Sequence, residues 1–430
     1  EEIRIHLQIL TDGTLDFRIV TFLFALCSHV DIRVVTSPHT HTNSQSPLII
    51  SPFSRLQQCG FTSGCCEFLS SVLSADHSRL IQLELGMNKL LDSGVHLLCE
   101  RLKHPNCKLE KLGLQSCGLT SECCEALSLV LSTEHSHLTE LWLSSNNLED
   151  SGVHWLCEGL RNPNCKLKKL KLWSSGLTSR CCDTLALALS VEHSRLNELR
   201  LGKNNLDNMG VFLLCEGLKS SHCKLQTLRL VSCGLTSGCC AALSSGLSVE
   251  HSSLTELEVG DNKLEDLGVS LLCQGLKNPN CKLKKLWIRA CGLTSGCCEA
   301  LSLVLSSKHS SLVEVDLSNN NLEDSGVHQL CEGLRNPNCK LETLWSCGLT
   351  SGCCEVLSLA LSAEHSRLTE LDLRKNILKD LGVQSLCKGL RSPNCKLEKL
   401  SHPGLHGGHQ NKAWKLIPVG ARGHPQGVPG

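Results

Sequence analysis

Apolar and polar positions alternate along this chain in a fixed order. Each unit of the pattern begins with a short stretch in which every second or third residue is leucine, for example Leu138, Leu141 and Leu143. Such spacing predicts a short strand that turns these side chains toward a core. A second stretch follows at the i, i+3, i+4, i+7 spacing of a helix face, with Val153, Leu156, Cys157 and Leu160. Pro163 then predicts the end of the helix.

The pattern repeats every 58 residues, and each repeat divides into two halves of 29. First halves open at Leu80, Leu138, Leu196, Leu254, Leu312 and Leu368, and second halves open at Leu109, Leu167, Leu225, Leu283 and Leu341. The step from Leu312 to Leu368 is only 56 residues, because the Leu341 half lacks two strand residues. Since each repeat contacts only its neighbours, we expect a weak point there. A period of this length is typical of leucine-rich repeats.

The predicted fold class is therefore α/β, a leucine-rich-repeat horseshoe solenoid. Strands stack about 4.8 Å apart whereas helices need about 10 Å, so the array is expected to curve with a concave parallel sheet inside and helices outside. About eleven complete half-repeats fall within residues 56–400. Residues 1–55 show no repeat register and are either a divergent flank or an incorrect gene prediction, and residues 401–430 form a Gly-, Pro- and His-rich tail expected to be disordered.

One polar position recurs just after each first-half strand. Asparagine occupies it at Asn88, Asn146, Asn204, Asn262, Asn320 and Asn376. We expect this side chain to be buried and to bond the backbone of its own turn and of the next repeat. In the second halves a cysteine such as Cys117 takes the slot, with Ser175 the exception. Asp150-Ser151 and Thr120-Ser121 are expected to cap the two kinds of helix.

Charge and cysteine content narrow the function classes. Lys plus Arg and Asp plus Glu both number 42, and this balance argues against a polybasic nucleic-acid binder. The apolar stretch at residues 17–27 is too short to span a bilayer. The 30 cysteines recur at fixed repeat positions, and no Asn-x-Ser/Thr acceptor is present. These features predict reduced, buried thiols and a cytoplasmic location, with no nucleic-acid or membrane partner.

The repeat motif resembles a known family. The stretches Glu149-Asp150-Ser151-Gly152-Val153, Asn162-Pro163-Asn164-Cys165-Lys166 and Cys117-Gly118-Leu119-Thr120-Ser121 are similar to the ribonuclease-inhibitor type of leucine-rich repeat. They look most like the C-terminal repeats of fish-type NACHT–LRR receptors (NLR proteins). The resemblance covers about residues 56–400 and implies a sensing and autoinhibitory module of an innate immune receptor. Its own NACHT module would then be one partner, and since the chain begins without Met we expect a fragment.

Catalytic and cofactor signals are weak. No phosphate-binding loop, H-E-x-x-H, G-x-S-x-G or C-x-x-C motif occurs, so we expect no enzyme activity and no cofactor. A recurring Cys-Cys-x10-His, as at Cys123, Cys124 and His135, would need more converging ligands to hold zinc. Buried cysteines with a polar loop histidine explain this pattern better than a metal site does.

The polar positions between strand leucines point to a binding surface. The position just before the second leucine alternates between basic and acidic residues, as at Lys111, Glu140, Lys169 and Glu198, which predicts a structural charge ladder between strands. The following outward positions vary although the repeats are nearly identical, so packing does not dictate them. Trp and Arg, the usual anchors of protein interfaces, gather there. The candidate protein-binding residues of the concave face are Trp142, Lys171, Trp173, Arg200, Arg229, Trp287 and Arg289.

Three functions stay open at this stage. The first is the receptor repeat module, and the second is a free-standing inhibitor that binds and inhibits a protein partner, as ribonuclease inhibitor does. The resemblance weighs against the second, because that family is acidic, whereas this chain is neutral and has no Tyr. The third is a purely structural array or the product of an incorrect gene prediction.

Overall fold

Each stretch that begins with the leucine pattern forms a strand of three residues in the computed structural model, which describes residues 53–75, 78–345, 348–374, 376–401 and 414–415. The chain divides into two compact units, which we call unit 1 (residues 1–205 and 222–224) and unit 2 (residues 206–221 and 225–430). Most of the predicted flank at 1–55 and most of the predicted tail at 401–430 lie outside the described residues.

Unit 1 alternates strands with helices in the order that the sequence predicts. Its elements are β1 (Phe53–Arg55), η1 (Ser63–Cys65), α2 (Cys66–Leu73), β2 (Gln82–Glu84), α3 (Leu91–Leu102), β3 (Lys111–Gly113), α4 (Glu122–Ser132), β4 (Glu140–Trp142), α5 (Glu149–Leu160), β5 (Lys169–Lys171), η2 (Ser179–Cys181), α6 (Cys182–Ser190) and β6 (Glu198–Arg200). The strands β1 to β6 pair in chain order, and every pair is parallel.

Unit 2 continues the same alternation. Its elements are α7 (Asp207–Leu218), β7 (Thr227–Arg229), η3 (Ser237–Cys239), α8 (Cys240–Leu247), β8 (Glu256–Glu258), α9 (Glu265–Leu276), β9 (Lys285–Trp287), η4 (Ser295–Cys297), α10 (Cys298–Leu305), β10 (Glu314–Asp316), α11 (Glu323–Leu334), β11 (Thr343–Trp345), η5 (Ser351–Cys353), α12 (Cys354–Leu361), β12 (Glu370–Asp372), α13 (Lys379–Leu390), β13 (Lys399–Ser401) and β14 (Trp414–Lys415). Strands β7 to β13 are parallel in chain order, whereas β14 joins β13 antiparallel, within the stretch predicted to be disordered.

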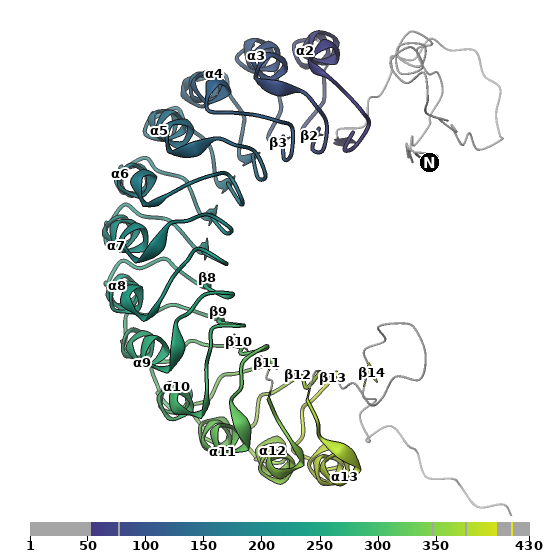
Figure 1. Ribbon diagram of the computed structural model, residues 1–430, viewed down its shortest axis with the longest axis vertical. Coiled ribbons are helices and arrows are strands. Elements are labelled where there is room, and N and C mark those ends of the chain that lie inside the picture. The colour runs from purple at the N-terminus through teal and green to yellow at the C-terminus, as the bar shows by residue number, and fades with distance from the viewer. Residues whose placement is uncertain (1–52, 76–77, 346–347, 375, 402–413, 416–430) are drawn as a thin grey trace, which may run out of the picture. The chain divides into compact units, whose positions relative to one another are not determined.

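Within each unit the strands line the inner side and the helices the outer side (Figure 1). This confirms the predicted leucine-rich-repeat solenoid with a parallel sheet. The leucines lie between the two layers: Leu138, Leu141 and Leu143 are each at most 2% exposed. The other face of the sheet carries no helices, and we call it the inner face (Figure 1). Strand residues such as Glu140 and Trp142, on either side of the core residue Leu141, lie on this face.

Small residues bring the helices of neighbouring half-repeats together. Gly152 lies near the start of α5, and a Cβ at this position would come within 2.9 Å of the Cys124 sulfur on α4. The apolar stripe predicted for α5 is buried as expected, with Val153, Leu156 and Cys157 all at 0% exposure. Cysteine thus acts as a small apolar residue in a core made mainly of leucine.

The recurring asparagine ties each turn to the preceding half-repeat. The Asn146 side-chain oxygen accepts hydrogen bonds from the backbone nitrogens of Cys117 (2.9 Å) and Leu119 (3.1 Å). Its amide nitrogen donates to the backbone oxygens of Leu114 and Leu143, both at 2.8 Å. The prediction of a buried turn-bonding asparagine is confirmed, but the expected direction was wrong, because the partner is the preceding half-repeat rather than the next.

The predicted cap at Asp150-Ser151 was wrong. Helix α5 begins at Glu149, whose φ is +56°, and its N-cap residue, Leu148, makes no side-chain hydrogen bond. The left-handed residue turns Asp150 toward the following half-repeat, where it accepts hydrogen bonds from the Thr178 nitrogen (2.8 Å) and hydroxyl (2.5 Å). Threonine does act as a cap there, since the Thr178 side chain accepts from the Arg180 nitrogen at the start of η2.

The shortened half-repeat keeps its strand. Residues of β11 pair in register with β10 and β12, with Leu344 opposite Val315 and Leu371. The prediction that strand residues are missing was therefore wrong, because the shortening falls after Trp345, next to residues 346–347, which lie outside the described chain. Whether stability drops there stays a prediction.

Candidate functional site

The candidate residues of unit 1 sit on three neighbouring strands. Trp142 on β4 pairs in register with Lys171 on β5, and Lys171 pairs with Arg200 on β6. Trp173 lies in the turn after β5, where its carbonyl accepts a hydrogen bond from the Ser145 nitrogen at 2.7 Å. The structure thus brings these four predicted residues together on the inner face of unit 1.

Two lysines of unit 1 lie over tryptophan rings. The Lys171 ammonium is 3.8 Å from the centroid of the Trp142 ring, and the Lys203 ammonium is 5.6 Å from that of Trp173. Such cation–π contacts contribute about 0.5–2 kcal/mol, more where water is excluded. Each pair joins side chains from adjacent half-repeats. Gly113 on β3 is the register partner of Trp142, and a Cβ there would be in van der Waals contact with the ring at 3.4 Å.

The charge environment of Lys171 is unfavourable. Burial lowers the pKa of its ammonium, and the nearby Arg200 guanidinium lowers it further. Arg200 itself is ion-paired with Glu198, with 2.5 Å between its Nε and the carboxylate. Within the described chain neither Lys171 nor Lys203 has a carboxylate at ion-pair distance, and each ammonium lies over a tryptophan ring instead. Glu198 and Glu140 act on the Lys171 ammonium from farther away and offset only part of the lowering of its pKa.

In unit 2 the candidate residues form a closed network. The Arg229 guanidinium on β7 lies 4.9 Å from the Trp287 ring centroid and 2.5 Å from Glu258. The Trp287 indole nitrogen donates to Glu314 at 2.7 Å. Arg289, in the turn after β9, is held 2.5 Å from Asp261, and this hydrogen bond raises the pKa of the guanidinium. Every candidate residue in unit 2 therefore has an acidic partner.

The predicted charge ladder is confirmed within each unit. Glu140 lies 3.3 Å from Lys111 and 3.2 Å from Lys169, and Lys285 lies 3.2 Å from Glu256 and 3.7 Å from Glu314. Burial works to raise the pKa of Glu140, but the two lysines outweigh it and the pKa is lowered. The lysines are more than a third exposed, so each pair adds about 0.5 kcal/mol or less. This ladder is structural.

Sequence reasoning missed the acidic partners in unit 2. Glu258 and Asp261 each lie one half-repeat from the arginine they bind, a spacing of 28 or 29 residues that the sequence contains. Trp155 does not fill the core, because it lies one residue off the buried stripe of α5 and is 43% exposed. The joining of the two candidate groups into one surface stays a prediction, since each belongs to a different unit.

The described part of the chain gives little support for a metal site. No group of three or more His, Cys, Asp or Glu side chains there converges as metal ligands would. Cys123 and Cys124 are buried, while His135 is exposed and contacts Glu134 at 3.5 Å. The described cysteines are free thiols, buried except for Cys387 and Cys395, which are partly exposed. No described helix has the length and apolarity needed to cross a membrane.

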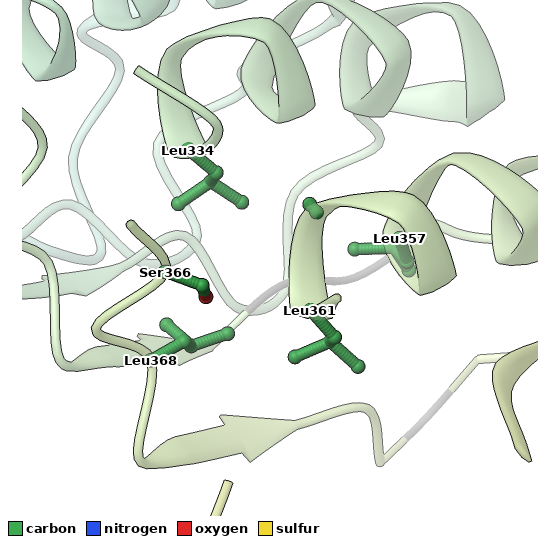
Figure 2. A pocket seen from close by; sticks show the side chains of 6 residues that line it. Leu334, Leu357, Leu361, Ser366 and Leu368 are labelled. Atoms are coloured by element: carbon green, nitrogen blue, oxygen red, sulfur yellow. The ribbon is translucent and has the colours of Figure 1, made fainter. Parts of the chain in front are cut away.

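A small apolar pocket lies in unit 2 between α11 and α12. Figure 2 shows the side chains that line it: Leu334, Leu357, Ala360, Leu361, Ser366 and Leu368. Its cavity volume is about 10 Å³, the lower limit for one water molecule. It is a packing gap between repeats and has no room for a cofactor or substrate.

Comparison with known proteins agrees with the repeat pattern. A family model described as "Leucine Rich repeat" matches residues 134–156, 250–273, 308–331 and 366–387. The chain is 48% identical over 387 residues to NACHT, LRR and PYD domains-containing protein 3 of Macaca mulatta, which covers 90% of this chain and 30% of the relative. It is 42% identical over 348 residues to ribonuclease inhibitor of Sus scrofa, which covers 80% of this chain and 75% of the relative.

A likeness to a solved structure is much weaker. An internalin from Listeria monocytogenes aligns at a TM-score of 0.43 and 18% identity, over 75% of this chain and 87% of that one. The chain spans less than a third of the NACHT, LRR and PYD relatives that it matches.

Proposed function

Since the chain belongs to the ribonuclease-inhibitor-type leucine-rich-repeat family, at 42% identity to an inhibitor of which it spans 75%, we propose that its inner face binds a protein partner. The candidate contact residues are those predicted from the sequence: Trp142, Lys171, Trp173, Arg200, Arg229, Trp287 and Arg289. The role is that of a binding module, and we propose no catalytic activity.

One observation carries this proposal. The half-exposed tryptophans of the inner face, Trp142, Trp173 and Trp287, sit at positions that other repeats fill with glycine, valine, arginine or carboxylate residues. The fold does not require them, because the sister repeats keep the same strand without an aromatic ring there. Large rings that packing does not need, beside cations, are the composition of interface hot spots.

The wider setting follows from the longer relatives. Matches of 45–49% identity to NACHT, LRR and PYD domains-containing proteins support a repeat module within an NLR-type receptor. In this setting the module would act in the cytoplasm in sensing and autoinhibition, and a NACHT module of the same receptor would be one partner. The free thiols buried throughout the repeats are compatible with a reducing compartment. The fish-type subdivision predicted from the motif also belongs to this proposal.

A second candidate is a free-standing inhibitor similar to ribonuclease inhibitor. Its specific support is the 42% identity over 348 residues to the pig inhibitor, a match that covers 75% of that relative. A ribonuclease inhibition assay separates the two candidates. Stoichiometric inhibition of a pancreatic-type ribonuclease favours the inhibitor, whereas unchanged ribonuclease activity at micromolar protein favours the receptor module.

The binding proposal is tested by affinity capture from cytosol, with quantitative mass spectrometry of the recovered proteins. The test protein carries Trp142→Ala and Trp173→Ala. The control carries Glu158→Ala on the outer helix α5 and Arg161→Ala at the C-cap of that helix, an ion pair whose side chains are 45% and 33% exposed. We expect at least a tenfold loss of the same partners with the inner-face variant, because a hot-spot side chain contributes about 2 kcal/mol or more. Equal recovery by wild type, test and control, all shown to be folded, contradicts the proposal.

A further inference from the structure

The inner faces of the two units differ in how their positive charges are balanced. From β3 to the turn after β6, the outward cations are Lys111, Lys169, Lys171, Arg200 and Lys203, and the outward carboxylates are Glu140 and Glu198. Those two carboxylates are already shared among Lys111, Lys169 and Arg200. Two lysines of unit 1 are therefore left with excess positive charge.

Unit 2 has no such excess on the corresponding strands. Arg229, Lys285 and Arg289 are paired with Glu258, with Glu256 and Glu314, and with Asp261. An incoming carboxylate would have to compete with acids that are already in place. The cations of unit 2 can therefore position Trp287, but we expect them to bind an anionic ligand weakly, because their carboxylate partners are already in place.

We infer that the inner face of unit 1 at β4 to β6 binds an acidic polypeptide segment through Lys171 and Lys203, held over Trp142 and Trp173. This inference rests on the proposed protein-binding function and names the chemistry of the partner. A carboxylate placed on either ammonium completes a charge-assisted hydrogen bond that the chain itself does not supply. Alternate residues of an extended segment lie about 7 Å apart on one face, so acidic side chains at every second position can reach both lysines.

A second observation supports an anionic ligand at this place. The Trp142 indole nitrogen is buried and has no hydrogen-bond acceptor among the described residues. An N–H in that state costs about 1–3 kcal/mol. A ligand carboxylate that reached this nitrogen would supply the acceptor that the described residues lack, as a second polar contact beside the lysines.

A polypeptide fits better than a nucleic acid. The Trp142 ring face is occupied by an ammonium at 3.8 Å and is not free to stack on a base. Glu140 on β4 and Glu198 on β6 lie on the two strands that flank Lys171 and would repel a continuous phosphate backbone. The formal net charge of +0 also supplies no long-range attraction for a polyanion.

The test measures fluorescence anisotropy of a labelled 12-residue peptide with Glu at alternate positions, added to the 430-residue chain at low salt. The comparators are the same peptide with Gln for Glu, and a 12-nucleotide oligothymidine. The test variant is Lys171→Gln/Lys203→Gln. The matched control is Lys285→Gln/Lys399→Gln, which removes the same charge from two lysines of unit 2 that are paired with carboxylates. A Lys171→Arg/Lys203→Arg variant checks rescue by a retained charge.

We expect the Glu peptide to bind wild type and the Lys171→Gln/Lys203→Gln variant to weaken binding about tenfold or more. The paired-lysine control of unit 2 should weaken it about twofold or less. The Arg variant should restore most of the affinity, and the Gln peptide should not bind. Absent binding of the Glu peptide, equal losses in both charge variants, or tighter binding of oligothymidine overturns the inference. If the tryptophan variants still abolish partner capture in that case, the proposed function stands and only the acidic chemistry is wrong.

Discussion

Removing the side chain of Asn146 is the sharpest perturbation of the repeat fold. The Asn146→Ala variant deletes five hydrogen bonds: two accepted from the Cys117 and Leu119 nitrogens, and three donated to the Leu114, Leu143 and Ser144 oxygens. These groups are buried from solvent: Asn146 is 6% exposed, and both Cys117 and Leu119 are at most 1% exposed. Two turns in neighbouring half-repeats lose their shared anchor.

The size of the effect follows from the two stranded donors. Each buried backbone N–H left without an acceptor costs about 1–3 kcal/mol. The two nitrogens of Cys117 and Leu119 therefore predict a loss of about 2–6 kcal/mol in the free energy of unfolding. The freed carbonyls add little, because under-satisfied oxygens are tolerated better than orphaned N–H groups.

The assay is urea unfolding followed by circular dichroism, with Asn147→Ala as the matched control. Asn147 is the next residue in the chain, but it is exposed and bonds only the exposed Glu149 through its side-chain nitrogen. We expect the control to change the free energy of unfolding by about 0.5 kcal/mol or less. A cost below about 1 kcal/mol for Asn146→Ala, with unchanged denaturant dependence, would refute this account of the asparagine ladder.

Three further outcomes follow from the structure. Asp150→Ala should lower the free energy of unfolding by about 1–3 kcal/mol, because it removes the acceptor of the Thr178 nitrogen and hydroxyl. Asp150→Asn should be tolerated, because Asn208 at the equivalent position accepts from the Thr236 nitrogen and donates to the Thr236 hydroxyl oxygen. Equal losses in urea unfolding would contradict this. Burial raises the pKa of Cys273 and Cys331 to about 12, whereas a thiol in the unfolded chain has a pKa of about 8.5. The unfolded thiols therefore ionise first, and the free energy of unfolding should fall as the pH rises from about 8.5 toward 12. Urea midpoints that stay flat from pH 8 to 11 would count against buried thiols. Hydrogen exchange should show weaker protection in the Leu341 half-repeat than in the Leu283 half-repeat, and uniform protection from residue 283 to 386 would exclude a weak point.

The sequence alone predicted the layers of the fold well because one period constrains every repeat at once. Leucines at strand positions and Val153, Leu156 and Cys157 on the helix had to be buried together, and they are. The direction of side-chain bonding was harder to predict. A period of 29 residues does not say whether Asn146 bonds the repeat before or after it, and the left-handed backbone at Glu149 that redirects Asp150 has no obvious sequence signal.

The candidate site shows the same limit. Positions between strand leucines were predicted to face away from the core, and Trp142 and Lys171 do so in contact with each other. Their electrostatic state was not predictable from residue types alone. Arg200 and Arg289 resemble free cations in the sequence, yet each has a carboxylate at 2.5 Å, whereas Lys171 has only a ring face.

Site-specific photocrosslinking tests the central claim, that the inner face of the sheet binds a protein partner, most directly. The photoreactive residue p-benzoylphenylalanine would replace Arg200 on β6 in one protein and Glu158 on the outer helix α5 in another, each exposed to the captured partner and irradiated. The account predicts a crosslinked partner band from position 200 that exceeds the band from position 158 at least several-fold. Equal bands from both positions, or a band from position 158 alone, would place the partner elsewhere and contradict the account.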